Sequence, residues 1–139
     1  MRNKEDAAAR MLPDRVSKRL LIIDDDPDIR QVLQDRLESL GYTVETAGNA
    51  LEALLAMEKM LPTGILLDFM LPAIDGLEVL QEVRRLYPML PVVIITANKD
   101  ERFAALAIAA GADDVLLKPV ENDQFKQVVR RCFGMPPRP

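Results

Sequence analysis

Four short apolar runs in this chain each end at a polar residue. They end at Asp24-Asp25, at Asp68, at Thr96 and at Lys118. Runs of this kind are typical of parallel strands that are buried on both faces. Because the carboxyl ends of parallel strands form the ligand crevice of an open α/β sheet, the pattern predicts that these side chains lie together. Three carboxylates, one hydroxyl and one ammonium can hold a divalent cation and a phosphoryl group.

The rest of the chain alternates between strand-like and helix-like segments, which predicts a doubly wound α/β fold. Asp26 is a typical N-cap, Pro27 suits the first position of a helix, and Gly41 is typical of a helix end. Five strand–helix units imply a three-layer sandwich, a parallel five-stranded sheet with helices on both faces. The predicted strands cover residues 19–24, 42–46, 65–68, 92–96 and 114–117.

Length and composition predict one domain and exclude several kinds of chemistry. The 139 residues suit a single domain over 19–133, preceded by an extension over 1–18, disordered or a short helix, and followed by a tail or truncated linker over 134–139. The net charge of -4 argues against nucleic acid as a direct partner. The chain has no histidine, so it cannot carry a phosphohistidine itself. No stretch predicts a membrane span or signal peptide, and the single Cys132 fits a reducing compartment, so we expect a cytoplasmic protein.

Each polar strand end also has an ordinary structural explanation. Consecutive aspartates suit the N-terminus of a helix, which explains Asp26 well but Asp24 poorly. Asp68 can be a nucleophile that forms an aspartyl phosphate, or a loop aspartate. Thr96 can simply end a strand, and Lys118 can be a surface lysine. Their occurrence at successive strand ends favours one common site.

Longer motifs around these strand ends resemble response-regulator receiver domains of two-component signalling. The resemblance covers about residues 19 to 133 and rests on Leu-Ile-Ile-Asp-Asp-Asp-Pro (21–27), on Leu-Leu-Asp-Phe-Met-Leu-Pro-Ala-Ile-Asp-Gly (66–76), and on the segments 94–97 and 110–119. It implies a flavodoxin-like fold with strand order 2-1-3-4-5.

The resemblance also implies a division of roles at the site. Asp68 would accept the phosphoryl group, and Mg2+, or Mn2+ in its place, would bind Asp25, Asp68 and the backbone carbonyl of Met70. Asp24 would bind the metal largely through a water molecule. The side chains of Thr96 and Lys118 would contact the phosphoryl group.

The implied partners follow from the same resemblance. The phosphoryl donor would be a sensor histidine kinase or a histidine phosphotransfer protein, and no membrane or nucleic acid would be bound directly. Phosphorylation would change the contacts of an output domain or a downstream protein, by a shift of populations. The face of the fourth helix, fifth strand and fifth helix would form a phosphorylation-dependent dimer. The chain would not be an enzyme with an external substrate.

Two positions depart from the commonest receiver pattern or affect the lifetime of the phosphorylated form. Val115 stands where many receivers carry an aromatic residue that moves inward with the threonine, and valine is too short and stiff to do the same. The output is therefore expected to depend on the Thr96 loop and the fourth helix, or coupling is weak.

In the family, the positions of Met70 and Asn98 flank the attacking water. Because a thioether is a weak acceptor, we expect slow dephosphorylation.

Two other functions compete with the phosphorylated receiver. A haloacid-dehalogenase-like phosphotransferase also uses a strand-end aspartate with magnesium, but it usually has a second aspartate where this chain has Met70. A receiver-like interaction module that is never phosphorylated would not need the complete set of site residues. A flavodoxin-like cofactor binder is disfavoured because no glycine-rich loop follows the first strand.

Overall fold

The computed structural model describes residues 18–71 and 76–136. Most of the predicted N-terminal extension, residues 72–75 of the receiver-like motif 66–76, and the last three tail residues lie outside the described residues. The described elements are β1 (Arg19–Ile23), α2 (Pro27–Ser39), β2 (Thr43–Ala47), α3 (Ala50–Lys59), β3 (Gly64–Asp68), α4 (Gly76–Leu86), β4 (Val92–Thr96), α5 (Glu101–Ala109), β5 (Asp114–Leu117) and α6 (Asn122–Phe133).

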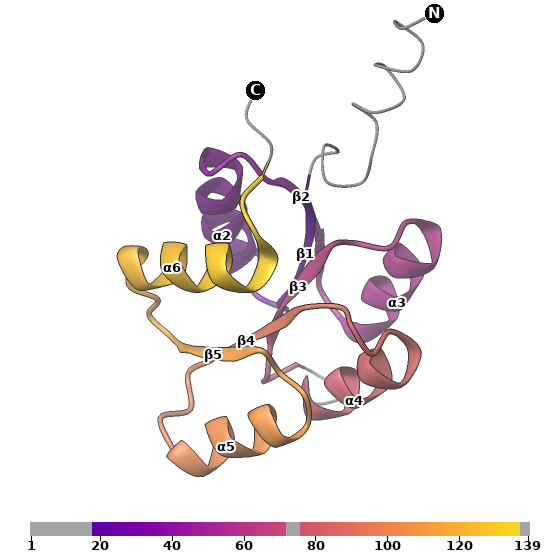
Figure 1. Ribbon diagram of the computed structural model, residues 1–139, viewed down its shortest axis with the longest axis vertical. Coiled ribbons are helices and arrows are strands. Elements are labelled where there is room, and N and C mark those ends of the chain that lie inside the picture. The colour runs from indigo at the N-terminus through magenta and orange to yellow at the C-terminus, as the bar shows by residue number, and fades with distance from the viewer. Residues whose placement is uncertain (1–17, 72–75, 137–139) are drawn as a thin grey trace, which may run out of the picture.

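The five strands form one parallel sheet in the order β2-β1-β3-β4-β5, as expected. Helices α2 and α6 cover one face of the sheet, and α3, α4 and α5 cover the other (Figure 1). Alternate residues of a strand therefore enter two separate cores: Leu21 and Ile23 pack under α3 and α4, whereas Leu20 and Ile22 pack under α2 and α6. The predicted three-layer α/β architecture is confirmed.

Local signals fix the turn that carries the first aspartates. The Asp26 side chain accepts hydrogen bonds from the backbone N–H groups of Asp28 and Ile29, and Pro27 occupies the first turn of α2. Gly41 follows the end of α2 with φ of 100°, a left-handed conformation that glycine adopts without a Cβ penalty. The predicted limits of this helix are confirmed.

The expectation that all four apolar runs are buried on both faces was wrong for the last one. All residues of β3 and β4 are buried, but β5 is an edge strand in which Leu117 is 45% exposed. The apolar run alone does not show that β5 has a neighbour on one side only.

The first part of the tail packs against the domain. The Tyr42 hydroxyl donates a hydrogen bond to the carbonyl of Gly134, and burial raises the pKa of this hydroxyl. Pro136 lies beside Gly41, at the turn between α2 and β2.

Among the described helices, none is long and apolar enough to cross a membrane.

Candidate functional site

Three carboxylates meet at the carboxyl ends of two neighbouring strands. Asp24 and Asp25 follow β1, and Asp68 is the last residue of β3, which pairs with β1. Oxygen atoms of the three carboxylates lie within 4.8 Å of one another. Asp24 and Asp68 are buried, whereas Asp25 is exposed. We call these three residues the acidic cluster.

The Lys118 ammonium bridges the two buried carboxylates from the end of β5. Its Nζ lies 3.1 Å from Oδ2 of Asp24 and 3.3 Å from Oδ2 of Asp68. Burial lowers the pKa of Lys118, but its hydrogen bonds and charge interactions with both carboxylates outweigh burial and raise this pKa. The peptide bond between Lys118 and Pro119 is cis.

Asp68 is held in a position where its carboxylate is costly to ionise. Burial, together with the nearby charge of Asp24, raises the pKa of Asp68 above the ordinary aspartate value. The backbone N–H of Met70, 3.0 Å from Oδ1 of Asp68, and the Lys118 ammonium oppose this rise. The Met70 side chain itself is 60% exposed.

The Thr96 side chain is buried at the end of β4, and its hydroxyl accepts a hydrogen bond from the Asn98 backbone N–H at 3.1 Å. The Thr96 carbonyl accepts from the Lys118 backbone N–H at 2.8 Å. The structure thus joins Thr96 to Lys118 through the main chain. It remains a prediction that Thr96 and Lys118 contact a phosphoryl group. It is likewise a prediction that the Met70 carbonyl binds the metal.

Asp24 is fixed by hydrogen bonds at every polar position. Its N–H donates to Ala47 O at 3.1 Å, its Oδ1 accepts from Asp26 N at 2.9 Å, and its Oδ2 binds Lys118. Its carbonyl accepts from Nη1 of Arg30 at 2.7 Å. Arg30 was missed from the sequence; the available signal was an arginine in the first turns of the helix that follows the strand-end aspartates.

Gly76 lets α4 begin directly against the strand end that carries Asp68. Its N–H donates to the Phe69 carbonyl at 2.9 Å. A Cβ at this position would lie 2.5 Å from Phe69 Cα and 2.8 Å from the carbonyl oxygen of Asp68. Both are main-chain atoms with little room to move, so any side chain here would displace the Asp68 segment.

An aromatic pair connects the Asp68 strand to α5. Phe69 follows Asp68 and is buried, and its ring meets the ring of Phe103 edge-on, with centroids 5.8 Å apart and an interplanar angle of 82°. Val115 of β5 is half-buried against the same core. Here an aromatic residue on α5 therefore contacts the core next to the site, while valine occupies the β5 position.

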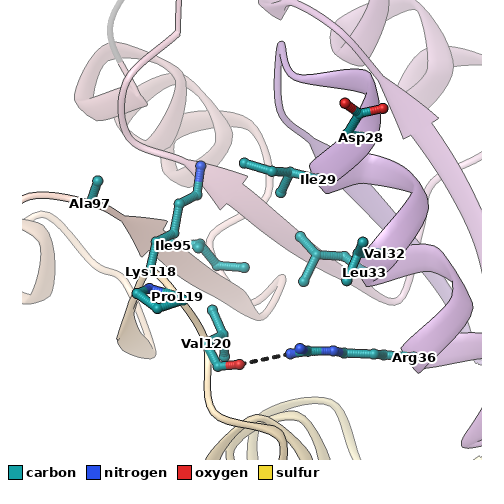
Figure 2. Close-up of a pocket in the computed structure, with 10 residues that line it drawn as sticks. All are labelled: Asp28, Ile29, Val32, Leu33, Arg36, Ile95, Ala97, Lys118, Pro119 and Val120. Carbon is teal, nitrogen blue, oxygen red and sulfur yellow. Dashed lines mark hydrogen bonds between the residues drawn. The ribbon is translucent and has the colours of Figure 1, made fainter.

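A groove of about 520 Å3 adjoins the acidic cluster (Figure 2). It runs between α2 and the β5–α6 loop, over the end of β4, and Figure 2 shows Lys118 at one end and Arg36 at the other. The Arg36 guanidinium closes that end by donating to the Val120 carbonyl at 2.9 Å. Its walls are mainly apolar, and its lining residues are Asp28, Ile29, Val32, Leu33, Arg36, Ile95, Ala97, Lys118, Pro119 and Val120. The sequence did not predict this groove.

The donor atoms of the acidic cluster fit a hard divalent cation. Carboxylate oxygens are the ligands that Mg2+ prefers, and an exposed Asp25 beside two buried carboxylates leaves room for retained water. The fold and this cluster define a flavodoxin-like domain that carries a strand-end aspartate within a cation site.

Comparisons with known proteins agree with this class. The family model described as "Response regulator receiver domain" matches residues 20–130. The alkaline phosphatase synthesis transcriptional regulatory protein PhoP of Bacillus subtilis is 38% identical over 120 residues, which cover 84% of this chain and 50% of PhoP. The DNA-binding transcriptional regulator NtrC of Escherichia coli is 39% identical over 113 residues, which cover 81% of this chain and 24% of NtrC.

A solved structure supports the same conclusion. The receiver domain of NtrX from Brucella abortus is 34% identical, with a TM-score of 0.79, and the match covers 82% of this chain and 97% of that one. The chain belongs to the response regulator receiver domain family of two-component signalling. It spans half or less of the length of PhoP and NtrC.

Family membership favours the receiver function over the phosphotransferase that the sequence left open. Receiver domains accept phosphoryl groups and are generally not enzymes, and they bind Mg2+ through an acidic cluster. The haloacid-dehalogenase alternative has no support.

Proposed function

We propose that Asp68 accepts a phosphoryl group from a phosphohistidine of a partner protein. The observation that carries this proposal is the placement of a buried Asp68 carboxylate at a strand end, next to two further carboxylates and an ammonium 3.3 Å away. A carboxylate oxygen of Asp68 attacks phosphorus, and the bond between phosphorus and the imidazole nitrogen breaks. The imidazole leaves with the bonding electron pair and then takes up a proton.

The side chains around Asp68 have distinct tasks in this transfer. Mg2+ or Mn2+ would be held by Asp24, Asp25, Asp68 and the Met70 carbonyl, because both ions accept oxygen ligands. When bound, the ion offsets negative charge on the phosphoryl oxygens. The Lys118 ammonium already lies against Asp68 and binds a phosphoryl oxygen once Asp68 becomes an acyl phosphate, which is a mixed anhydride.

Intact mass measurement tests the acceptor directly. The protein is incubated with acetyl phosphate and Mg2+, and we expect one phosphoryl adduct in the wild type and none in Asp68→Asn. Asp35→Asn, which changes an exposed aspartate on α2, is the matched control and should keep the adduct. An adduct of equal yield in Asp68→Asn would overturn the assignment.

The groove beside Lys118 supports a location for the phosphohistidine partner. Its walls are mainly apolar, and Val32 on α2 is half exposed there although it is a large apolar side chain. Since Lys118 lines the groove and contacts Asp68, an apolar surface bound in the groove would lie next to the acceptor. We therefore place the donor protein on α2 and the β5–α6 loop, in the cytoplasm where the free thiol of Cys132 is stable.

This location makes a prediction about two kinds of donor. Val32→Arg should slow transfer from a phosphorylated histidine phosphotransfer protein that acts on the wild type, because a charge would enter an apolar contact. The same variant should react normally with acetyl phosphate, which needs no docking surface. Leu51→Arg, at an exposed leucine on α3 across the sheet, is the control and should leave both rates unchanged. Normal transfer to Val32→Arg from the protein donor contradicts this location.

The output is expected to travel through Thr96 and α5 to the face of α5, β5 and α6, where a dimer or a downstream partner binds. The contact between Phe69 and Phe103 supports a role for α5, because it ties that helix to the residue after Asp68. Val115 has no ring to move, so the usual aromatic on β5 does not contribute.

A further inference from the structure

Arg30 lies outside the acidic cluster but forms a hydrogen bond with the main chain of a cluster residue, Asp24. Its guanidinium donates to the carbonyl of Asp24 at 2.7 Å, from the fourth residue of α2. Gly48, on the loop after β2, leaves the space for this group: a Cβ at Gly48 would lie 3.0 Å from the same nitrogen of Arg30. The arginine is half-buried at this point, so the contact is part of the folded domain and not a loose surface pair.

The carbonyl of Asp24 belongs to the peptide unit that leads to Asp25. Because a peptide unit is planar, fixing its oxygen also fixes the direction of the next N–H and the start of the Asp25 residue. Within the described parts of the chain, no group donates a hydrogen bond to the Asp25 carboxylate, although this carboxylate belongs to the cluster. The position of Asp25 therefore depends on its main chain, and the Arg30 bond is one of the contacts that hold that main chain.

We propose that Arg30 is a positioning residue for cation binding: its bond to the Asp24 carbonyl holds the Asp24–Asp25 peptide so that the exposed Asp25 carboxylate faces the two buried ones. This inference rests on the proposed function, because it assumes that the acidic cluster binds Mg2+. Partners that orient metal ligands from outside the ligand set commonly change metal affinity by about 10-fold to 100-fold when they are removed.

The positive charge of Arg30 would affect Mg2+ affinity in the direction opposite to its positioning role. A cation next to three carboxylates disfavours a second cation, so loss of the charge alone would tighten Mg2+ binding. Loss of positioning would weaken it. The two effects therefore differ in sign for the same substitution, Arg30→Met. We expect positioning to dominate because the guanidinium contacts the Asp24 carbonyl and, among the described residues, forms no ion pair with the acidic cluster.

The experiment is a Mg2+ titration followed by the backbone amide signals of the full chain in NMR spectra. Arg30→Met should raise the Kd for Mg2+ about tenfold. Before any metal is added, it should also speed hydrogen exchange at the Asp26 amide, which donates to Asp24 Oδ1 at 2.9 Å in the wild type. Arg84→Met is the matched control: Arg84 also donates to a backbone carbonyl, that of Gly111 at 2.8 Å, in the turn between α5 and β5. It should lower stability and leave the Kd for Mg2+ unchanged.

The outcomes separate this inference from the proposed function. If Arg30→Met binds Mg2+ as tightly as the wild type, or more tightly, Arg30 does not position the site. If Arg84→Met weakens Mg2+ binding as much as Arg30→Met does, the effect is one of general stability and the inference is also overturned. If the wild type itself binds no Mg2+, the proposed cation site fails, whereas the Asp26 exchange rates still report whether Arg30 holds this turn.

Discussion

Among the described residues, Lys118 is the one ammonium that pairs with the two buried carboxylates. Lys118→Met should therefore lower the free energy of unfolding. The substitution keeps a flexible side chain of similar length but removes the charge. In the wild type, Nζ lies 3.1 Å from Asp24 and 3.3 Å from Asp68, and the side chain of Lys118 is 19% exposed. In the variant, two buried carboxylates with oxygens within 4.8 Å of each other lose their counter-charge.

These distances set limits on how much stability Lys118→Met loses. With an effective dielectric constant of about 20, each attraction is worth roughly 5 kcal/mol, and two carboxylates no more than 4.8 Å apart repel by at least about 3.5 kcal/mol. The variant can instead take up a proton, which costs about 4 kcal/mol at pH 7 for an ordinary aspartate. Removing one partner of a buried ion pair costs about 3–5 kcal/mol. We expect a loss of about 3 kcal/mol, near the lower end because Lys118 is partly exposed.

The loss should depend on pH in a defined direction. Burial already raises the pKa of Asp68 above its unfolded value, and removal of Lys118 raises it further. A carboxyl group with a raised folded-state pKa favours folding while it is protonated, and this contribution is lost as pH rises through the folded-state pKa. The difference between variant and wild type should therefore be largest at neutral pH and should shrink as pH falls toward about 4.

Urea unfolding with a metal chelator, at neutral and at acidic pH, measures this difference. Lys59→Met, at an exposed lysine on α3, is the control and should stay close to the wild type. Added Mg2+ should stabilise Lys118→Met more than the wild type, because the cation replaces the lost charge and binding to the folded state adds to stability. If the free energy of unfolding of Lys118→Met lies within about 0.5 kcal/mol of the wild-type value at neutral pH without metal, Lys118 does not balance the two buried carboxylates.

Three further predictions concern packing, lifetime and output. Gly64→Ala places a Cβ 2.3 Å from Cδ1 of Phe133 in a close-packed core, and should cost about 1–3 kcal/mol in urea unfolding; an unchanged midpoint contradicts this. Met70→Asn adds an amide that can orient the attacking water, so the acyl phosphate, followed by intact mass, should decay several-fold faster than in the wild type; equal half-lives refute the role given to Met70. Thr96→Ala should still be phosphorylated, but phosphorylation should not change its self-association when this is measured by size exclusion. A variant that switches as fully as the wild type would disprove dependence on Thr96.

The sequence predicts those parts of the fold that depend on local signals. Asp26 and Pro27 start α2, and Gly41 follows its end, because capping and left-handed turns are decided within a few residues. The strand ends at Asp68 and Lys118 were also found locally, and the parallel sheet then brings them together. The strand order itself came from the resemblance to receivers and not from the periodicity of the chain.

Other features that depend on contacts between distant segments were not predicted. An apolar run does not tell an edge strand from a central one, so the exposure of Leu117 was missed. Arg30 follows the strand-end aspartates in the sequence, but its proposed role depends on the Asp24 carbonyl that it contacts in the fold. The groove likewise forms between α2 and the distant Lys118–Val120 segment. Phe103 contacts Phe69 although 33 residues separate them in the sequence.

The start of α4 has a consequence for genetic screens of this protein. A search for variants that fail to become phosphorylated would recover substitutions of Gly76 together with those of Asp68, although Gly76 offers no side chain to the chemistry. The two classes differ in cause: a residue at Gly76 pushes on the main chain of Asp68 and Phe69, so it should impair folding and phosphorylation together. Ranking such variants by stability as well as by activity would separate residues that react from those that only leave space.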